Sequence, residues 1–339
     1  MKLITLNTHS LAEPDYENKL KLFARAVLRE TPDVIALQEV NQSVDEEPVG
    51  TEQLRECGFT RCREVELESG EAAGCGPDGC GEMRKIGVGN CKGQAEHGVG
   101  DWGGNVPVRA DNHAFRLAGL LAEGGMPCFW TWVPAKIGYG RYDEGTALFS
   151  RRPIAQARWF YLTGTRDYNN WKTRKALEIC VEESGRQRRF FSLHMGWWGD
   201  EEEPFARQWE RLSGYLERGG VRPEAEDGEL CFLMGDFNAP AGIPGEGYEL
   251  VRRSGWLDTY ELAARRDGGI TVGGAIDGWR DTAHGDGMRM DFIWANRELS
   301  VSRSQVICNG VYGPVVSDHC GVMIECEPGT VPGRGERAR

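Results

Sequence analysis

Polar side chains of catalytic type stand directly after apolar segments of this chain. Asn7, Glu39 and His194 each follow a run of apolar residues typical of a β-strand. In open α/β sheets, ligands gather beyond the strand ends, where loops converge. Each residue also has a structural alternative: Asn7 could cap a helix, Glu39 could be a surface acid, and His194 could be a hydrogen-bonded core histidine. Their repeated position favours a polar site at the strand ends.

Two further motifs combine an acid with an amide or a base. In Gly235-Asp236-Phe237-Asn238, the glycine permits a tight turn, so a carboxylate and an amide two residues apart can face one point. Asp318 and His319 stand before a predicted final strand, and Asp291 opens another. A neutral histidine suits general-base catalysis when a carboxylate fixes its tautomer, and Asp291 is the natural partner of His319. These residues predict acid–base chemistry.

Hydrophobic periodicity predicts the elements that position these groups. Apolar residues recur at helical spacing over about residues 15–30, and further helices are predicted at Ala114–Ala122 and Phe205–Glu217. The fully apolar Val34–Leu37 is typical of a strand buried on both faces. The other predicted strands are 2–6, Phe129–Val133, Thr146–Phe149, Leu177–Val181, Phe190–His194, Leu230–Met234, Asp291–Trp294 and Val322–Cys326.

Two segments differ in character from the rest. Residues 69–112 are rich in glycine and poor in large apolar side chains, which predicts a long loop or insertion over the active site. Cys75, Cys80, Cys91 and His97 in this segment are candidate zinc ligands, but their spacings of four, ten and five residues match no familiar zinc pattern, and free thiols are the alternative. The tail 327–339, rich in Gly, Pro and Arg, is predicted to be disordered.

The composition limits the partners. The net charge of −12 and the lack of a basic stripe disfavour nucleic acid without excluding it, and leave small phosphorylated substrates open. The sequence has no secretory signal and no apolar run long enough for a membrane span, so we expect no membrane partner and a cytoplasmic location with most of the eleven cysteines reduced. Nothing in the sequence indicates an oligomeric state.

Five motifs occur in the order found in the endonuclease/exonuclease/phosphatase superfamily. They are Leu6-Asn7-Thr8-His9, Leu37-Gln38-Glu39-Val40, Gly235-Asp236-Phe237-Asn238, Arg289-Met290-Asp291-Phe292 and Ser317-Asp318-His319. The chain over about residues 1–326 resembles most the branch that contains maltose 6'-phosphate phosphatases. The segments that carry this closer resemblance are 137–145, 170–175, 194–198 and 276–280.

The resemblance implies a four-layer α/β sandwich, with two mixed sheets face to face and helices outside, formed as one domain over residues 1–326. It implies that Asn7, Glu39 and Asp318 hold Mg²⁺ or Mn²⁺, whose preferred ligands are hard oxygens. His319, held by Asp291, would activate water or orient the phosphate. Asp236 and Asn238 would position the nucleophile or a second metal. His194 would donate a hydrogen bond to the phosphoryl oxygens.

Cationic and aromatic residues near these motifs are candidates for substrate binding. Arg141, Lys172, Arg174 and Lys175 could hold a phosphate dianion, because guanidinium and ammonium groups pair with phosphate oxygens; surface ion pairs are the alternative. Flat faces for a sugar could come from Trp171, Trp197 and Trp198, near Tyr142, although most tryptophans serve packing.

Four functions follow from these observations. The leading hypothesis is a metal-dependent phosphatase that hydrolyses a phosphomonoester of a sugar or similar small metabolite by in-line attack of water. The first alternative is a nuclease, which the same metal centre would serve. A phospholipid or inositol-phosphate hydrolase and a non-catalytic binding module are the remaining alternatives.

Overall fold

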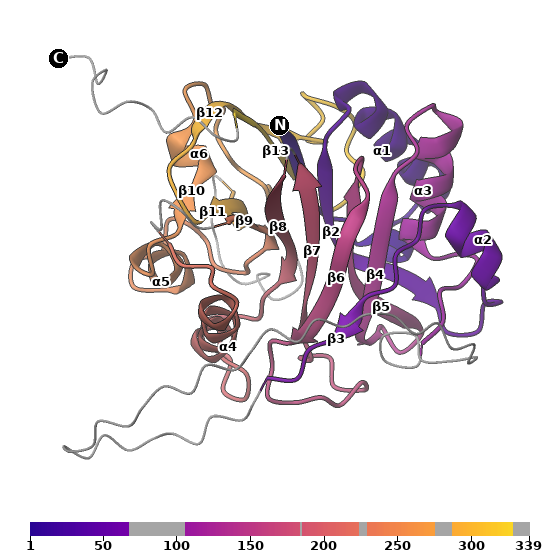
Figure 1. Ribbon diagram of the computed structural model, residues 1–339, viewed down its shortest axis with the longest axis horizontal. Coiled ribbons are helices and arrows are strands. Elements are labelled where there is room, and N and C mark those ends of the chain that lie inside the picture. Colours follow the sequence, from indigo (N-terminus) through magenta and orange to yellow (C-terminus); the bar gives the residue numbers. More distant parts are fainter. Residues whose placement is uncertain (68–105, 184, 224–228, 275–286, 328–339) are drawn as a thin grey trace.

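The computed structural model describes residues 1–67, 106–183, 185–223, 229–274 and 287–327 (Figure 1). Within these ranges the strands form two β-sheets. The six-stranded sheet has the order β12 (Ser300–Ile307), β13 (Gly321–Glu327), β1 (Lys2–Asn7), β2 (Val34–Ser43), β5 (Tyr142–Ser150) and β4 (Phe129–Gly138). The seven-stranded sheet has the order β10 (Leu257–Asp258), β11 (Asp291–Ala295), β9 (Leu230–Asp236), β8 (Arg186–His194), β7 (Lys175–Glu183), β6 (Ile154–Tyr161) and β3 (Arg63–Glu64).

Helices cover the outer face of each sheet. In Figure 1, α1 (Tyr16–Glu30), α2 (Thr51–Glu56) and α3 (His113–Glu123) lie on one side of the molecule, and α4 (Phe205–Arg218) and α5 (Gly247–Arg253) lie on the other. Two short helices, η1 (Ser10–Ala12) and α6 (Thr259–Leu262), complete the set in the described ranges. The predicted four-layer α/β sandwich with two mixed sheets is therefore confirmed.

Three apolar clusters separate the four layers. One packs α1 and α3 on the six-stranded sheet, a second fills the space between the sheets, and a third packs α4 and α5 on the seven-stranded sheet. Large side chains such as Trp130, Trp159 and Phe205 are completely or almost completely buried in them. Burial of each such side chain contributes roughly 1.5–3 kcal/mol or more, which makes both sheets rigid supports for the site.

Strand register brings the polar strand ends together. β1 pairs in parallel with β2, so Asn7 lies beside Gln38, the residue before Glu39. On the other sheet, β8 and β9 are parallel and His194 lies opposite Asp236, while the antiparallel β11 sets Asp291 on the other side of Asp236. These five side chains therefore converge at one end of the sandwich, as expected from strand-end positions.

The structure extends several predicted elements and adds others. The predicted strands at Val34–Leu37, Phe129–Val133 and Thr146–Phe149 are each longer in the structure. Strands β6 and β12 were not predicted at all. Glu327 ends β13, so assigning it to the disordered tail was wrong. The rest of the tail, most of the 69–112 segment with its candidate zinc ligands, and residues 276–280 lie outside the described residues.

Two properties of the described residues bear on the sequence expectations. Their eight cysteines are free thiols. None of their helices has both the length and the apolar character needed to cross a membrane.

Candidate active site

A cavity of about 290 Å³ lies at the converging strand ends. The lining residues that the sequence predicted are Glu39, Trp171, Arg174, His194, Trp197, Asp236, Asn238, Asp318 and His319. The lining residues that were not predicted are His9, Lys136, Gly138, Tyr139 and Glu144. Both sheets contribute to the lining, so the cavity depends on how the two sheets are packed.

Asn7 connects two carboxylates from different sheets, the partly exposed Glu39 and the buried Asp236. Its Nδ2 donates hydrogen bonds to Glu39 Oε1 at 2.9 Å and to Asp236 Oδ2 at 3.1 Å. Burial and the charge of Glu144 raise the pKa of Glu39 to about 7, and burial also raises the pKa of Asp236 to about 6. Charged carboxylates are costly in such a place unless a cation accompanies them.

These carboxylates fit a divalent metal ion. Glu39, Asp236 and Asp318 line the same cavity, and carboxylate and amide oxygens are the donors that Mg²⁺ and Mn²⁺ take. The raised pKa values of Glu39 and Asp236 are the electrostatic mark of negative charges that lack a compensating cation. The predicted donors therefore suit a metal ion in their chemistry, and the assignment of Asn7, Glu39 and Asp318 as its ligands stays a prediction.

His319 and Asp291 form a buried pair. His319 Nδ1 lies 3.0 Å from Asp291 Oδ2, which leaves Nε2 on the side of Asp236, with 3.8 Å between Nε2 and Asp236 Oδ2. Burial opposes the charged form of His319, but the negative charges of Asp291 and Asp236 outweigh it and raise its pKa to about 10. The ring is therefore an imidazolium at neutral pH, suited to bind an anion.

The Gly235–Asn238 segment fixes the carboxylate of Asp236. Gly235 has a φ of +144°, and a Cβ there would lie 1.9 Å from the carbonyl oxygen of Leu193. Asp236 Oδ1 accepts the backbone N–H of Asn238 at 2.8 Å, and Asn238 Nδ2 donates to the carbonyl oxygen of Met195 at 2.9 Å. Asp236 and Asn238 both line the cavity, but Gly235 does not form the predicted tight turn: it lies inside β9, where the lack of a side chain allows close approach of Leu193.

His194 stands between the acidic and the basic sides of the cavity. Its Nε2 lies 3.8 Å from Asp236 Oδ2 and 4.0 Å from Glu39 Oε1. Burial, together with the positive charges of Arg174 and Lys136, holds its pKa well below the usual range. His194 is therefore a neutral imidazole, able to donate one hydrogen bond.

Arg174 and Lys136 form the basic side. Lys136 Nζ pairs with Glu144 Oε1 at 3.0 Å and donates to the carbonyl oxygen of Trp171 at 2.8 Å. Arg174 donates from NH1 to the same carbonyl oxygen at 2.9 Å, while its buried Nε has no hydrogen-bond partner. Burial lowers the pKa of both groups, and the positive charge of Arg174 lowers the pKa of Lys136 further. A buried guanidinium with unused donors is a ready receptor for an anion.

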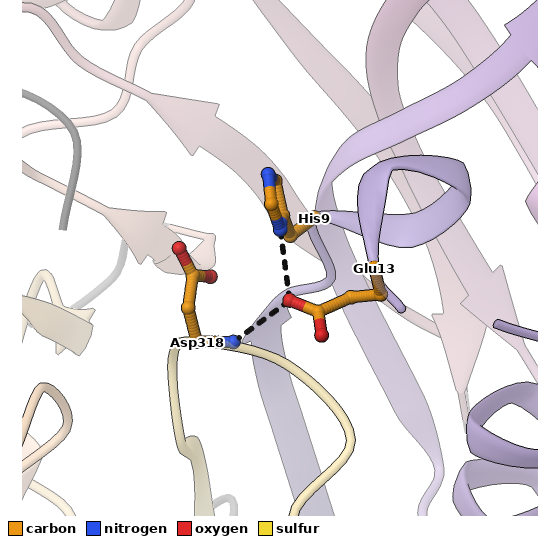
Figure 2. A group of neighbouring side chains, drawn as sticks. All are labelled: His9, Glu13 and Asp318. Atoms are coloured by element: carbon orange, nitrogen blue, oxygen red, sulfur yellow. Dashed lines mark hydrogen bonds and ion pairs between the residues drawn. The ribbon is translucent and has the colours of Figure 1, made fainter. Parts of the chain in front are cut away.

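A second set of polar groups braces the cavity rim. Figure 2 shows the Glu13 carboxylate between the His9 ring and the backbone of Asp318. Glu13 Oε1 lies 2.8 Å from His9 Nδ1 and accepts the Asp318 N–H at 3.1 Å, and Glu13 Oε2 pairs with Lys19. The side chains of His9, Glu13 and Asp318 lie close enough together to hold a metal ion. Both carboxylate oxygens of Glu13 already have partners, however, so we interpret these residues as a structural support of the cavity rim.

The comparisons with known proteins decide the family. The model of the endonuclease/exonuclease/phosphatase family matches residues 4–319. The chain belongs to this family. Members of it hydrolyse phosphoesters and generally depend on a divalent metal, so the chain has the fold and family of a phosphoester hydrolase. No protein of curated function matches the sequence.

Solved structures of similar fold extend over nearly the whole chain. An endonuclease/exonuclease/phosphatase family protein from Leptotrichia buccalis C-1013-b is 26% identical, covers 97% of this chain and 100% of its own, and superposes with a TM-score of 0.71. A mannosyl-6-phosphatase from Bacteroides thetaiotaomicron VPI-5482 is 15% identical, with 97% and 100% covered and a TM-score of 0.57. D. rerio TDP2 in complex with a single-strand DNA product is 12% identical, with 97% and 99% covered and a TM-score of 0.53. The last two show likeness of fold alone.

Several substrate-binding residues predicted for this family member lie outside the cavity lining. The exposed Arg141 stacks on Tyr142, whose hydroxyl donates to the carbonyl oxygen of Leu11. Lys175 Nζ donates to the carbonyl oxygen of Pro134 and lies over the Trp159 ring in the core between the sheets. Trp198 packs on Phe205, and Lys172 pairs with Asp200 and Glu202. Their contact with a substrate stays a prediction.

Besides Gly138, four cavity residues were not predicted as site residues although signals existed for each. His9 belongs to the first family motif, and Tyr139 and Glu144 fall in the segment that had been singled out for its mixed aromatic and charged groups. Lys136 is a charged residue inside the apolar β4, where a cation needs a partner, and Glu144 is that partner.

Proposed function

We propose that this protein is a divalent-metal-dependent phosphomonoesterase that acts on a phosphorylated sugar or a similar small metabolite. One observation carries the proposal: the carboxylates of Glu39, Asp236 and Asp318 line the same cavity as the buried guanidinium of Arg174, whose Nε has no partner. A metal at the carboxylates and this guanidinium would together hold the charges of a terminal phosphate dianion.

The size and the aromatic lining of the cavity support a small substrate. A cavity of about 290 Å³ is at the lower end of the range for small-molecule sites. Trp171 and Trp197 line it with their ring centroids 5.3 Å apart and offer apolar surface to a sugar ring. The mannosyl-6-phosphatase of the same fold illustrates that this architecture is compatible with a phosphorylated sugar.

Each polar group then has a role that suits its charge. A bound Mg²⁺ or Mn²⁺, held by Glu39 with Asn7 and Asp318, would polarise the phosphoryl group and stabilise the leaving oxygen. Asp236, oriented by Asn7 and Asn238, accepts the proton of the attacking water, for which its raised pKa is suitable. The His319 imidazolium binds a phosphoryl oxygen, rather than acting as the base. Neutral His194 donates a hydrogen bond to another oxygen, and the products are the free alcohol and inorganic phosphate.

A nuclease is the alternative with a specific observation in its favour, because TDP2 of the same fold is seen with single-strand DNA. The net charge of −12 opposes it, since a long polyanion is attracted mainly through neutralised phosphates. A non-catalytic module has less support, because Glu39, Asp236, Asp318 and His319 all line this cavity. Nothing among the described residues specifically favours a phospholipid or inositol-phosphate hydrolase. The cytoplasmic location stays a prediction.

The test is phosphate release from hexose phosphates, compared with cleavage of single- and double-stranded DNA and RNA, each with Mg²⁺ and with EDTA. We expect metal-dependent release of inorganic phosphate from at least one hexose phosphate and intact nucleic acids. Cleavage of nucleic acid with hexose phosphates left unchanged would overturn the substrate class and favour the nuclease.

A further inference from the structure

Lys136 is a buried cation on a strand that is otherwise mostly apolar. Its exposed fraction is 7%, and it lines the cavity together with Arg174. A lysine ammonium removed from water destabilises the folded protein unless its N–H groups find acceptors. The position of Lys136 at the cavity, rather than in a packed core, suggests that its charge is used there.

A one-residue bulge in β4 turns Lys136 towards the inside of the sandwich. Trp132 packs in the apolar cluster outside the six-stranded sheet, and Val133 packs in the cluster between the two sheets, so side chains of β4 alternate between these faces. Continued alternation would place Lys136 on the outer face with Trp132. However, β4 carries one extra residue between Pro134 and Lys136 relative to its partner β5. Such a bulge moves the following side chains to the opposite face, which here is the face of the cavity.

Glu144 lies opposite Lys136 on β5 and pairs with it. The two residues are partners in the β4–β5 ladder, and Lys136 Nζ lies 3.0 Å from Glu144 Oε1. Gly138 makes room for this carboxylate, because a Cβ at Gly138 would lie 2.5 Å from Glu144 Oε2. Opposite charges that face each other across two strands stabilise the pairing of the strands. Glu144 therefore holds the ammonium group in place at the cavity.

The ammonium group of Lys136 keeps one N–H for a ligand. It has three N–H donors. Within the part of the chain that the structure describes, two of them have acceptors, which are Glu144 Oε1 and the carbonyl oxygen of Trp171 at 2.8 Å. Burial and the charge of Arg174 lower the pKa of Lys136, whereas the charge of Glu144 raises it and so helps to keep the group charged.

Lys136 and Arg174 are close enough to contact one phosphate group. The carbonyl oxygen of Trp171 accepts from Lys136 Nζ at 2.8 Å and from Arg174 NH1 at 2.9 Å, so the two nitrogens can be no farther apart than the sum of these distances. After burial, the charges of these two cations are the main causes that lower the pKa of His194. Both cations therefore act at the place where neutral His194 would donate to a phosphoryl oxygen.

We propose that Lys136 binds a non-bridging oxygen of the terminal phosphate beside Arg174 and thereby makes the enzyme selective for phosphomonoester dianions over phosphodiester monoanions. This inference rests on the proposed phosphomonoesterase function and names a residue that sets its substrate preference. Lys136 contacts the substrate, whereas Glu144 is a positioning residue. The selection arises because a diester carries one negative charge fewer and presents one unesterified oxygen fewer to the two cations.

The experiment compares kcat/KM for p-nitrophenyl phosphate and for bis(p-nitrophenyl) phosphate, both with Mg²⁺ and at a pH where the monoester is a dianion. In Lys136→Met, the value for the monoester is expected to fall roughly 10- to 100-fold, because a charge-assisted hydrogen bond is lost. The value for the diester changes less than about threefold. Lys2→Met is the matched control, since it removes a lysine of β1 that pairs with Glu30 outside the cavity lining, and it leaves the ratio of the two values unchanged.

A double variant separates phosphate binding from the effect of leaving Glu144 unpaired. Lys136→Met combined with Glu144→Gln removes both charges, so no unpaired buried charge remains. This variant should lose the monoester preference as Lys136→Met does, while its melting temperature stays close to that of the wild type. The inhibition constant of inorganic phosphate, the dianionic product, should rise roughly 10- to 100-fold in both variants.

The outcomes distinguish this inference from the proposed function. Equal losses on both esters in the double variant, no loss on either, or an unchanged inhibition constant of phosphate would overturn the role of Lys136, while monoester preference of the wild type keeps the proposed function. A wild type that prefers the diester would overturn the proposed phosphomonoesterase, and the inference with it.

Discussion

Two carboxylates at the cavity, the partly exposed Glu39 and the buried Asp236, are the electrostatic basis of the proposed metal site. Glu39 and Asp236 are both linked to Asn7, and each has a pKa raised by burial. Negative charges in this position destabilise the folded protein unless a cation binds. Metal binding is therefore expected to stabilise the fold. Neutralising one carboxylate should therefore lower the activity, while the metal-free protein becomes no less stable.

Glu39→Gln tests this expectation. Loss of the carboxylate should lower kcat/KM at least about 100-fold, because a metal ligand is lost. In EDTA its melting temperature should equal or exceed that of the wild type, because a poorly compensated buried charge is removed. Activity assays and thermal unfolding check the two effects, with the exposed Glu52→Gln on α2 as control. Retained activity would contradict the assignment of the metal site.

Substitution of Arg174 offers a second test, of its proposed role in phosphate binding. Arg174→Lys should lower kcat/KM for phosphomonoesters roughly 10- to 100-fold, because lysine cannot replace a planar guanidinium with several fixed donors. The control is Arg151→Lys at an exposed position, where the guanidinium makes a loose ion pair of 3.9 Å with Asp33 and a long hydrogen bond of 3.4 Å to the carbonyl oxygen of Thr31. Steady-state kinetics with one hexose phosphate decide the matter. Equal behaviour of the two variants would remove Arg174 from phosphate binding.

Neighbouring residues show where sequence reasoning about the site stops. Arg174 lines the cavity, but Lys175 next to it enters the core between the sheets. Trp197 lines the cavity, but Trp198 packs towards α4. Side-chain direction follows strand or helix periodicity only inside regular elements, and these pairs stand at a strand start and in a loop. The type of side chain was predictable there, and its direction was not.

At the scale of elements, the strand ends were the informative feature. Apolar runs that end in Asn7, Glu39 and His194 predicted convergence at one end of the sheets, and strand register supplies it. The length of the strands was underestimated, because β2 continues past Leu37 through the polar residues Asn41 and Gln42, which are buried and hydrogen-bonded. Those partners lie far away in the chain, so their burial could not be read locally.

Glu30, the last residue of α1, allows a prediction about how stability depends on pH. Burial raises its pKa, but hydrogen bonds from Lys2, Arg29 and Tyr312 outweigh burial and lower it below the usual 4.5. Since the folded-state pKa is the lower one, Glu30 stabilises the fold above pH 4.5, and this stabilisation is lost as the pH falls through the folded-state value.

Glu30→Gln should therefore lower the free energy of unfolding at pH 7 by about 2 kcal/mol, from loss of charge-assisted hydrogen bonds. The difference from the wild type should narrow as the pH is lowered from 7 towards 3. Denaturant unfolding at several pH values measures both effects, with Glu123→Gln at the exposed end of α3 as control. A difference that stays constant with pH would show that the Glu30 charge does not stabilise the fold.

At the scale of the whole molecule, both sheets of the sandwich contribute side chains to one site, which has an acidic side and a basic side. Glu39 and Lys136 come from the six-stranded sheet, and Asp236 from the seven-stranded sheet, with Arg174 just before β7. With a net charge of −12, the molecule as a whole repels polyanions, whereas this cavity combines Arg174 and Lys136 with the proposed catalytic groups. Fold and family were predictable from ordered motifs. On the basic side of the cavity Arg174 was predicted, but Lys136 was not, because it pairs with Glu144 through the β4–β5 hairpin.

The most direct test of the central claim is the ratio of kcat/KM for p-nitrophenyl phosphate to that for bis(p-nitrophenyl) phosphate, measured with Mg²⁺ and again with EDTA. The two esters share a leaving group and differ in the dianionic or monoanionic charge of the phosphate. We predict that the monoester is preferred at least about tenfold, because Arg174 and the metal side hold a dianion. EDTA should remove both activities. Preference for the diester, or hydrolysis of the monoester that persists in EDTA, would contradict a metal-dependent phosphomonoesterase.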